Sequence, residues 1–327
     1  MRKKALNVKP LIQHQAEQIE DRAFQRFSTK NVLIAGLITL LYLFWVIQIM
    51  GVRSDHYFLL SICLGAYFGG ATSRKIFWGF LFVVLYWFVY DAMRVYPNYM
   101  VNPVHIQEPY DLEKMLFGIN YGGQLLTPNQ YFALHNHPVL DIASAIFYLC
   151  WVPVPMMYVV YLFFKDKPLM VQFGWTFFLV NVIGITIYYL YPAAPPWYVE
   201  DYGFELRMNT PGSAAGLLRF DEFFGISLFS NMYEKNANVF AAIPSLHAAF
   251  PVILLYFGLK KKLKYASLLF LVILVGIWFA AVYTFHHYFI DVLIGGLSAS
   301  IAIGLYELLM RTQRFKRWLN SYLLLVN

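Results

Sequence analysis

Two short histidine-bearing segments are the part of this sequence whose residue types and spacing suit chemistry. The first is Ala-Ile-Pro-Ser-Leu-His-Ala-Ala at 242–249, and the second is His-His-Tyr-Phe-Ile-Asp at 286–291. Histidine is the side chain whose charge changes near neutral pH, so it serves as an acid, a base or a nucleophile. These segments therefore indicate acid–base or covalent chemistry centred on imidazole rings.

In the first segment, a proline, a serine and a histidine stand where a loop passes into an apolar stretch. We expect Pro244 to end the loop, Ser245 to cap the helix that follows, and His247 to lie in the first turn of that helix. The N-terminus of a helix offers free N–H groups and the positive end of the helix dipole. A phosphate or another anion is therefore the kind of ligand that this segment is suited to bind.

The second segment pairs a histidine with an acidic residue. His287 and Asp291 are four residues apart, so on a helix they share one face and Asp291 can accept a hydrogen bond from an imidazole nitrogen. That bond fixes the tautomer of the ring and leaves its other nitrogen free to act as a nucleophile. An acidic side chain in so apolar a stretch is costly without a partner, which makes Asp291 a functional candidate.

Composition places these segments in a membrane protein. The chain has 327 residues, of which 60% are hydrophobic, 19% are aromatic and only 13% are charged. A soluble domain of this length needs far more surface charge, and tryptophan and tyrosine gather where lipid meets water. The two cysteines, Cys63 and Cys150, lie in apolar runs, so no disulfide framework is expected.

Eight stretches are apolar enough to be expected to cross a bilayer, which takes about 20 residues for each crossing. Because backbone groups in lipid must pair internally, we expect helices and an all-α integral membrane protein. Two N-terminal spans then occupy 31–74, and a six-span core occupies 75–310. The eight stretches are 31–51, 55–72, 75–93, 139–164, 169–191, 243–259, 264–284 and 286–310.

The distribution of lysine and arginine predicts on which side of the membrane each connection lies. With the N-terminus inside, 19 of the 25 basic residues fall on the inner side and 6 on the outer side. Both termini are therefore expected in the cytoplasm, and the long connections 94–138 and 192–242 on the outer face. All the histidines except His14 fall on that outer side. The net charge of +7 is explained by this orientation, and nothing in it indicates a nucleic acid partner.

Amphipathic pieces are expected outside the spans. Residues 10–28, in the cytoplasmic N-terminal segment 1–30, alternate apolar and charged side chains as an interfacial helix does, and so does the cytoplasmic tail 311–327. In the first outer connection, 108–119 is a third amphipathic piece. It is expected either to lie on the membrane surface or to cap the helical bundle.

Together, the two histidine segments resemble motifs two and three of the type-2 phosphatidic acid phosphatase superfamily, membrane enzymes that act on lipid phosphates. PSLH is followed 40 residues later by HHYFID. The PSLHA form and the doubled histidine look most like the inositol phosphorylceramide synthase branch, and the resemblance covers roughly residues 75–310. It implies that His287 is the nucleophile, Asp291 its orienting partner, His247 the acid that protonates the leaving oxygen, and Ser245 a phosphate contact.

The sequence departs from the phosphatase form of the superfamily where that form supplies cations. Ala280 and Ala281 stand where motif three has Ser-Arg, and YPAAPPW at 191–197 replaces a motif one that contains Lys and Arg-Pro. A phosphate monoester carries close to two negative charges and a phosphodiester carries one, so a site with fewer cations suits a diester. Four cations of the outer segments would restore the charge if they folded into the site: Arg94, Arg207, Arg219 and Lys235.

The resemblance implies a two-step transfer that needs no metal and no other cofactor. His287 would attack the phosphorus of phosphatidylinositol while His247 protonates the departing diacylglycerol, and the hydroxyl of ceramide or dihydroceramide would then take the phosphoinositol group from the histidine. The alternative is a lipid phosphate or polyprenyl pyrophosphate phosphatase with water as acceptor. A lipid transporter or scaffold of the same fold is a third possibility, against which an intact acid, nucleophile and orienting group argue.

Further substrate-binding candidates are His286, Arg94, Asp141 and Tyr283. Asp141 lies just inside a span, where it suits the hydroxyl groups of a lipid headgroup. Arg94 either forms a helix-end ion pair with Asp91 or reaches toward phosphate.

No metal site is predicted, because His135 and His137 have no cysteine or acidic partner at ligand spacing. Short loops and the absence of glycosylation sequons favour a bacterial inner membrane over an organelle membrane. The identity of the headgroup beyond the resemblance, the acyl chains and the oligomeric state stay open at this stage.

Overall fold

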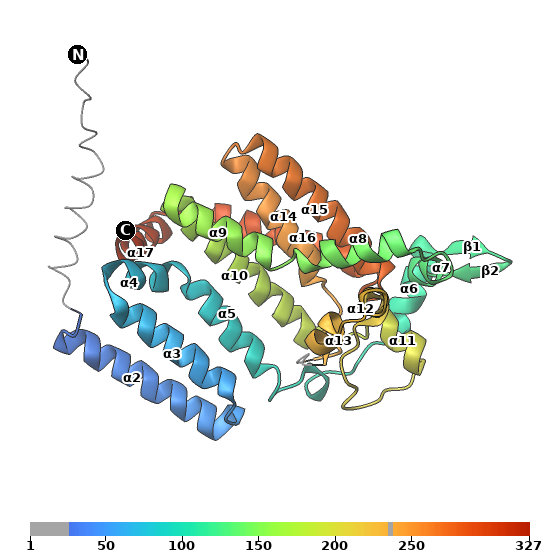
Figure 1. The fold of residues 1–327 in the computed structure, drawn as a ribbon, viewed down its shortest axis with the longest axis horizontal. Helices are drawn as coiled ribbons and strands as arrows, with labels where there is room; N and C mark the ends of the chain where they lie inside the picture. The colour runs from blue at the N-terminus through green and yellow to red at the C-terminus, as the bar shows by residue number, and fades with distance from the viewer. Residues whose placement is uncertain (1–25, 235–237) are drawn as a thin grey trace, which may run out of the picture. The chain divides into compact units, whose positions relative to one another are not determined.

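The computed structural model describes residues 26–234 and 238–327, which are helical apart from one short hairpin. They form two compact units, one containing the chain up to Leu81 together with Ser321–Asn327, and the other Phe82–Asn320. The interfacial helix predicted at 10–28 falls almost wholly outside the described residues, as do His14 and Lys235. Figure 1 labels the helices and strands of both units.

The first unit is a succession of helices joined by tight turns. Ser28 caps α2 (Thr29–Trp45) by accepting a hydrogen bond from the Asn31 N–H, and α2 continues into a single π-helical stretch, η1 (Val46–Met50). Gly51, with φ of 76°, makes the turn that follows. The helices α3 (Ser54–Gly69) and α4 (Ala71–Gly79) then pack against each other.

The second unit is a helical bundle with α14 at its centre. Helix α14 packs against α15, α16, α10 and α9, while α8 packs against α15 and α10 against α16 (Figure 1). Prolines stand at the first turns of α8, α9 and α10, where a missing backbone N–H costs nothing. The helices are α5 (Leu81–Ala92), α8 (Pro138–Leu149), α9 (Pro153–Lys165), α10 (Lys167–Leu190), α14 (Leu246–Lys260), α15 (Lys264–Tyr283) and α16 (Phe289–Leu309), while α17 (Gln313–Val326) is divided between the two units.

The described helices are those of a multi-pass membrane protein with five to six candidate spans, where the sequence predicts eight. Two predicted spans correspond to shorter helices, α3 with 16 residues and α14 with 15. Helices α4 and α5 form one further candidate if they are counted as a single span. The five that are long enough by themselves are Thr29–Met50, Pro138–Lys165, Lys167–Leu190, Lys264–Tyr283 and Phe289–Leu309.

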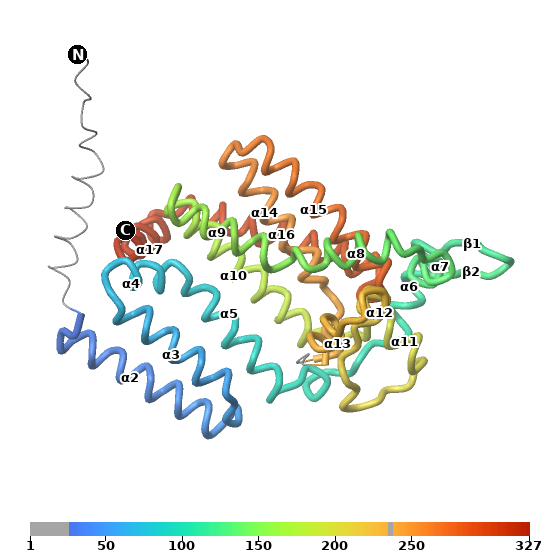
Figure 2. The backbone as a smooth tube through the Cα atoms, in the orientation of Figure 1, coloured from blue at the N-terminus to red at the C-terminus, as the bar shows by residue number. Residues whose placement is uncertain are grey.

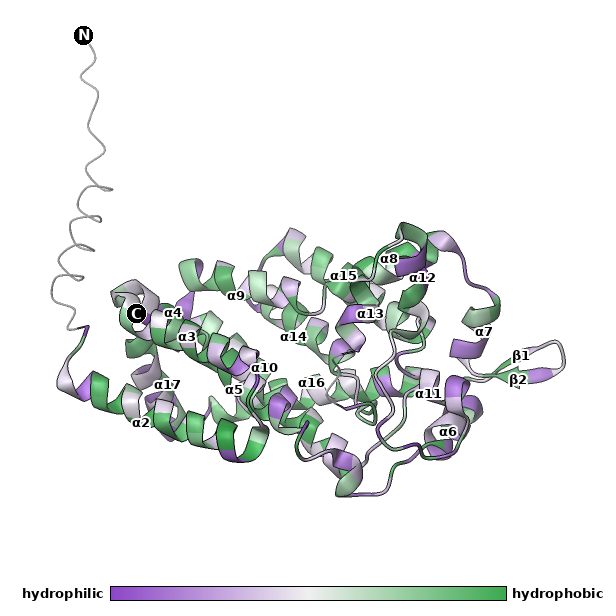
Figure 3. Cartoon of the chain, turned by 60° about the horizontal axis from the view of Figure 1, so that its bottom comes forward, coloured by the Kyte–Doolittle hydropathy of each residue, from purple (hydrophilic) through white to green (hydrophobic). Residues whose placement is uncertain are grey.

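The two long connections of the second unit gather at the same end of the bundle, as the predicted topology requires (Figure 2). Single β-bridges join His105 to Ala193 and Ala193 to Ala241, so both connections are tied to the segment that precedes α14. Figure 3 shows hydrophilic colour in α6 and hydrophobic colour along much of α8 and α15. The connections contain α6 (Gln107–Phe117), the hairpin β1 (Ile119–Tyr121) and β2 (Gln124–Leu126), α7 (Pro128–Leu134), α11 (Pro196–Tyr202), α12 (Leu218–Phe224) and α13 (Leu228–Tyr233), with the 3-10 turns η2 (Asn98–Met100) and η3 (Ala215–Leu217).

Candidate active site

The first histidine segment has the local structure that the sequence predicts. Helix α14 begins at Leu246, and the Ser245 side chain caps it by accepting a hydrogen bond from the Ala248 N–H at 3.2 Å. His247 is the second residue of the helix. The Tyr188 hydroxyl donates to the Pro244 carbonyl at 2.9 Å, which holds the entry to α14 against α10.

The second histidine segment is not helical where the sequence predicts a helix. Helix α16 begins only at Phe289, so His287 lies in the turn before it. The chain must reverse between α15 and α16, and Phe285 does this with a left-handed φ of 63°. The N–H groups of His286 and His287 donate to the Ala281 carbonyl at 3.1 and 3.0 Å, which closes the end of α15. The prediction that His287 and Asp291 share a helical face is therefore wrong, although their side chains meet.

Three side chains stand in a row where the two segments come together. His247 Nδ1 lies 3.4 Å from His287 Nε2, and His287 Nδ1 lies 3.5 Å from Asp291 Oδ2. Asp291 is fully buried, and His287 is 6% exposed. This arrangement places a carboxylate against one nitrogen of His287 and a second imidazole against the other.

Close backbone packing fixes this row. The Ser245 N–H donates to the Asp291 carbonyl at 3.0 Å, and the Tyr288 N–H donates to Asp291 Oδ2 at 2.9 Å. One turn along α16, a Cβ atom on Gly295 would lie 2.2 Å from the Ser245 carbonyl oxygen, so only glycine permits the helices to approach this closely.

We expect Gly295→Ala to separate the two segments, because backbone atoms cannot yield as a flexible side chain does. A displacement of about 1 Å between reacting groups lowers activity about 100-fold. Gly304→Ala on the same helix is the matched control, since no atom lies within 4 Å of its added Cβ. Turnover and melting temperature of both purified variants test this, and equal activity of the two would contradict it.

Aromatic rings surround the two imidazoles that face the bundle. Tyr148 stacks on His247 with ring centroids 4.8 Å apart, and Trp151 meets the same histidine edge-on at 4.6 Å. Tyr148 also lies 4.9 Å from His286, and Tyr233 lies 4.6 Å from that ring. These contacts restrict the ring orientations and exclude water from the site.

The His286 ring is neutral, and one of its two nitrogens can accept a hydrogen bond. Its Nδ1 lies 3.1 Å from the Thr284 carbonyl and 3.0 Å from the Thr284 hydroxyl, so we assign the proton to Nδ1. Burial lowers the pKa of His286 to about 3. Its Nε2 is buried with no hydrogen-bond partner in the described chain. A neutral Nε2 acceptor suits a hydroxyl or an amide N–H of a substrate rather than a phosphate oxygen.

Asp141 and Tyr283 come together in a second cluster, with Arg219 from α12. Arg219 Nε donates to Asp141 Oδ1 at 2.6 Å, the Tyr283 hydroxyl donates to the same oxygen at 2.8 Å, and the guanidinium lies 5.2 Å from the Tyr283 ring centroid. Arg219 Nη2 is buried without a partner in the described chain. Thr284 connects this cluster to His286, because it follows Tyr283 in the chain and its hydroxyl and carbonyl both contact His286 Nδ1.

The other cations named from the sequence lie elsewhere. Arg94 Nε is 3.4 Å from Asp91 Oδ1, which is the helix-end pair that was one of its two predicted alternatives. Arg207 lies 5.1 Å from the centroid of the Tyr202 ring. The alanines that replace Ser-Arg in motif three, at 280 and 281, are fully buried in an apolar cluster. Of these described candidates, Arg219 is the one that pairs with Asp141 and lies over the Tyr283 ring, two residues that the sequence also names.

His135 and His137 have structural contacts. His137 caps α8 by accepting the Val139 N–H at 3.2 Å, and His135 stacks on Tyr131 with centroids 4.2 Å apart. Among the described residues, no group of three or more histidine, cysteine, aspartate and glutamate side chains has an arrangement suited to a metal ion.

Two residues that support the site were not predicted from the sequence. Asn129, fully buried in α7, donates to the carbonyls of Val282 and His287 at 2.8 and 2.9 Å. Glu113, fully buried in α6, accepts the N–H groups of Phe289 and Ile290 at 2.9 and 3.1 Å. An acidic residue in an amphipathic piece is typical of a solvated face, so its burial was not expected. Helix α6 caps the bundle at the start of α16, one of the two predicted alternatives.

Glu113 predicts a pH dependence of stability. Burial raises the pKa of this carboxyl from its ordinary 4.5 to about 7. Its stabilising contribution is therefore fully present below about pH 4.5 and lost as the pH rises through about 7. We expect Glu113→Gln to flatten the fall of melting temperature between those values, and Asp111→Asn, exposed on the same helix, to leave it unchanged. If the melting temperatures of the wild-type protein and the Glu113→Gln variant fell equally with pH, this expectation would be contradicted.

The comparison with known families agrees with this geometry. The model of the PAP2 superfamily matches residues 124–305, which contain both histidine segments and helices α8 to α15. The chain belongs to the PAP2 superfamily. Within this superfamily, the phosphoinositol dihydroceramide synthase of Bacteroides thetaiotaomicron is 44% identical over 298 residues, which are 90% of this chain and 98% of that protein.

Fungal proteins of the same kind are also similar. The inositol phosphorylceramide synthase catalytic subunit aur1 of Schizosaccharomyces pombe is 28% identical over 75% of this chain and 58% of its own length. The inositol phosphorylceramide synthase of Candida albicans is 30% identical over 59% of this chain and 40% of its own length. This PAP2 chain thus spans about half the length of these fungal relatives. No solved structure gives a significant match. The chain is therefore a homologue of phosphotransferases that make inositol phosphosphingolipids, as its two motifs predict.

Proposed function

We propose that this PAP2 protein transfers the phosphoinositol headgroup of phosphatidylinositol to dihydroceramide or ceramide. The observation that most strongly supports this is the row of His247, His287 and Asp291 in a chain that is 44% identical to a phosphoinositol dihydroceramide synthase over nearly that protein's whole length. Each step of the transfer has a residue of suitable chemistry in this row.

In the first step, His287 Nε2 attacks the phosphorus of phosphatidylinositol. Its Nδ1 proton faces Asp291, which keeps the tautomer in which Nε2 has a free electron pair. His247 Nδ1 lies 3.4 Å from this nitrogen, so the bound phosphate must displace that contact, and its leaving oxygen then lies beside His247. His247 gives its proton to the glycerol oxygen as the phosphorus–oxygen bond breaks, and diacylglycerol leaves. The phosphoinositol group remains on His287.

The second step reverses the proton movement. His247, now without that proton, takes one from the primary hydroxyl of dihydroceramide. The hydroxyl oxygen attacks the phosphorus, the bond from phosphorus to His287 Nε2 breaks, and inositol phosphodihydroceramide forms. Burial of His287 and Asp291 limits the access of water, which is the competing acceptor in a phosphatase.

We assign the binding of the headgroup to the polar groups around the histidine row. Ser245 and the free N–H groups at the start of α14 face the phosphate, and neutral His286 Nε2 accepts from a hydroxyl. Asp141, Arg219 and Tyr283 provide the alternating donors and acceptors that a polyhydroxylated ring needs. A single arginine already paired with a carboxylate suits a phosphodiester with one charge better than a monoester with two.

We expect Arg219→Gln to raise the KM for phosphatidylinositol about 30-fold, the effect of losing about 2 kcal/mol of charged hydrogen bonding. The value of kcat should change little, because Arg219 does not contact the histidine row. Arg207→Gln serves as the control, since its guanidinium lies against Tyr202 instead. If Arg219→Gln lowered only kcat, the proposal that Arg219 binds the headgroup would be contradicted.

The proposed topology has eight spans, both termini in the cytoplasm and the active site on the outer face of a bacterial inner membrane. The split of 19 inner to 6 outer basic residues supports it, and so does the gathering of both long connections at one end of the bundle. A cysteine placed in the hairpin at Gly122 should react with an impermeant maleimide from outside intact cells. Reaction only after lysis would reverse the orientation.

One assay tests the proposed function. Purified protein in detergent receives headgroup-labelled phosphatidylinositol with and without dihydroceramide, and the lipid and aqueous products are separated. The proposal expects a labelled sphingolipid that appears only when dihydroceramide is present. Rapid release of water-soluble inositol phosphate in both samples, with no labelled sphingolipid, would instead identify a phosphatase-type reaction.

A further inference from the structure

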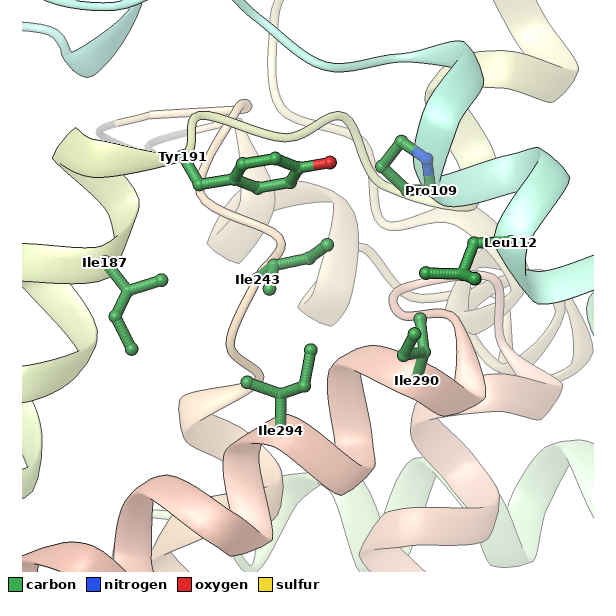
Figure 4. A pocket seen from close by; sticks show the side chains of 7 residues that line it. All are labelled: Pro109, Leu112, Ile187, Tyr191, Ile243, Ile290 and Ile294. Carbon is green, nitrogen blue, oxygen red and sulfur yellow. The ribbon is translucent and has the colours of Figure 1, made fainter. Parts of the chain in front are cut away.

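An apolar pocket lies next to the start of α16 (Figure 4). Its volume is about 280 Å³. The ring of Tyr191 extends over the space, and Leu112 of α6 lines it on the other side of Pro109. The lining consists of Pro109, Leu112, Ile187, Tyr191, Ile243, Ile290 and Ile294.

The walls of the pocket are the segments that assemble the histidine row. Ile290 and Ile294 flank Asp291 on α16, and Ile243 stands two residues before Ser245, whose N–H bonds to the Asp291 carbonyl. On the α6 side, Glu113 follows Leu112 and accepts the Ile290 N–H at 3.1 Å. A ligand in the pocket is therefore within one helical turn of the carboxylate that orients His287.

The lining dictates the chemistry of the occupant. Six of the seven side chains are aliphatic or proline, so the pocket offers almost nothing to a headgroup and favours hydrocarbon. A cavity of about 150 Å³ holds benzene, so this volume accommodates roughly ten carbon atoms. That is part of one lipid chain and too little for a whole diacylglycerol.

The two-step reaction brings two alcohols to the same place. In an in-line displacement the leaving oxygen stands opposite the attacking nitrogen, and the acceptor must later attack from that same side. The departing diacylglycerol and the entering dihydroceramide therefore occupy one site in turn, and a hydrocarbon chain is what they share.

We propose that this pocket binds one hydrocarbon chain of the lipid alcohol, first that of the donor and then that of the acceptor. The inference rests on the proposed function, because the chain belongs to the two lipids of that reaction. It adds a specificity-determining site: chain contacts in the pocket hold either lipid near the histidine row.

Photo-crosslinking tests the pocket without requiring turnover. Phosphatidylinositol, dihydroceramide and phosphatidylcholine, each with a diazirine in one chain, are irradiated with the protein in nanodiscs, and the labelled peptides are identified by mass spectrometry. We expect the first two probes to label peptides containing Leu112 or Ile294 more than phosphatidylcholine does. Ile294→Trp, which fills the pocket, should reduce that labelling about tenfold, the effect of roughly two lost methylene contacts.

Leu297→Trp is the matched control, because Leu297 is 58% exposed on the same helix and outside the lining. Equal labelling by phosphatidylcholine would show bulk lipid in the pocket and overturn the proposal, as would labelling that Ile294→Trp leaves intact. Labelling by only one of the two substrate lipids would contradict the shared site. If no transfer is detected while the two lipids still label the pocket, the proposed reaction is contradicted and the binding of a lipid chain in the pocket is supported.

Discussion

His287→Ala is expected to abolish transfer, with kcat lowered by a factor on the order of 10⁴ or more, because the nucleophile of a covalent mechanism has no substitute. The side chain is almost fully buried and is held from both sides, by Asp291 at 3.5 Å and His247 at 3.4 Å. Initial rates of labelled sphingolipid formation measure the loss. Binding of phosphatidylinositol should persist, since the proposed headgroup contacts come from other residues.

The neighbouring histidine provides the control for this variant. His286 is buried to the same degree, yet its Nδ1 is committed to Thr284, so His286→Ala should raise KM and leave most of kcat. If His286→Ala and His287→Ala lowered kcat equally, the loss would come from disturbed packing of the turn before α16 and not from loss of the nucleophile. A fully active His287→Ala protein would eliminate the mechanism.

Asp291→Asn is expected to lower kcat by about 10⁴-fold, as loss of the orienting carboxylate does in a serine protease, while leaving the fold intact. The amide oxygen can take the place of Oδ2, which lies 2.9 Å from the Tyr288 nitrogen and 3.5 Å from His287 Nδ1, so the bond to the Tyr288 N–H is kept. The amide has no negative charge, so it no longer stabilises the positive charge that develops on the His287 ring as Nε2 attacks. Activity falls because the nucleophile is weakened, with little change in KM.

Asp141→Asn is the matched exchange in the second cluster. Asp141 accepts from Arg219 and Tyr283 and touches no residue of the row, so its loss should act on the KM for phosphatidylinositol. We expect Asp291→Asn to lower kcat and Asp141→Asn to raise KM. This difference distinguishes a carboxylate that orients the nucleophile from one that binds the headgroup. The same pattern in both would mean that one of these assignments is wrong.

The site was largely predictable because its chemistry is concentrated in two short segments. Ser245 capping α14 follows from local helix chemistry, and the meeting of His247 with His287 follows from a topology that puts both at one end of the bundle. The prediction that His287 lies in a helix was wrong because the turn depends on a left-handed conformation of Phe285. That conformation is uncommon for a bulky residue, so the sequence does not predict it.

What could not be predicted depends on long-range packing. Four cations stood in or beside the outer connections, and selecting Arg219 required knowing that α12 folds back onto Asp141. Glu113 and Asn129 act on backbone groups more than 150 residues away in the chain. The span count differs because α3 and α14 have only 16 and 15 residues, and the pattern of apolar residues does not show where a helix ends.

The most direct test of the account is to identify the covalent intermediate. Wild-type protein is mixed with headgroup-labelled phosphatidylinositol in the absence of dihydroceramide and denatured under alkaline conditions, which preserve phosphohistidine, and the labelled peptide is then sequenced by mass spectrometry. The account predicts one phosphoinositol group on His287, which disappears when dihydroceramide is added before denaturation. Label on any other residue, or full transfer with no labelled protein at any time, would contradict it.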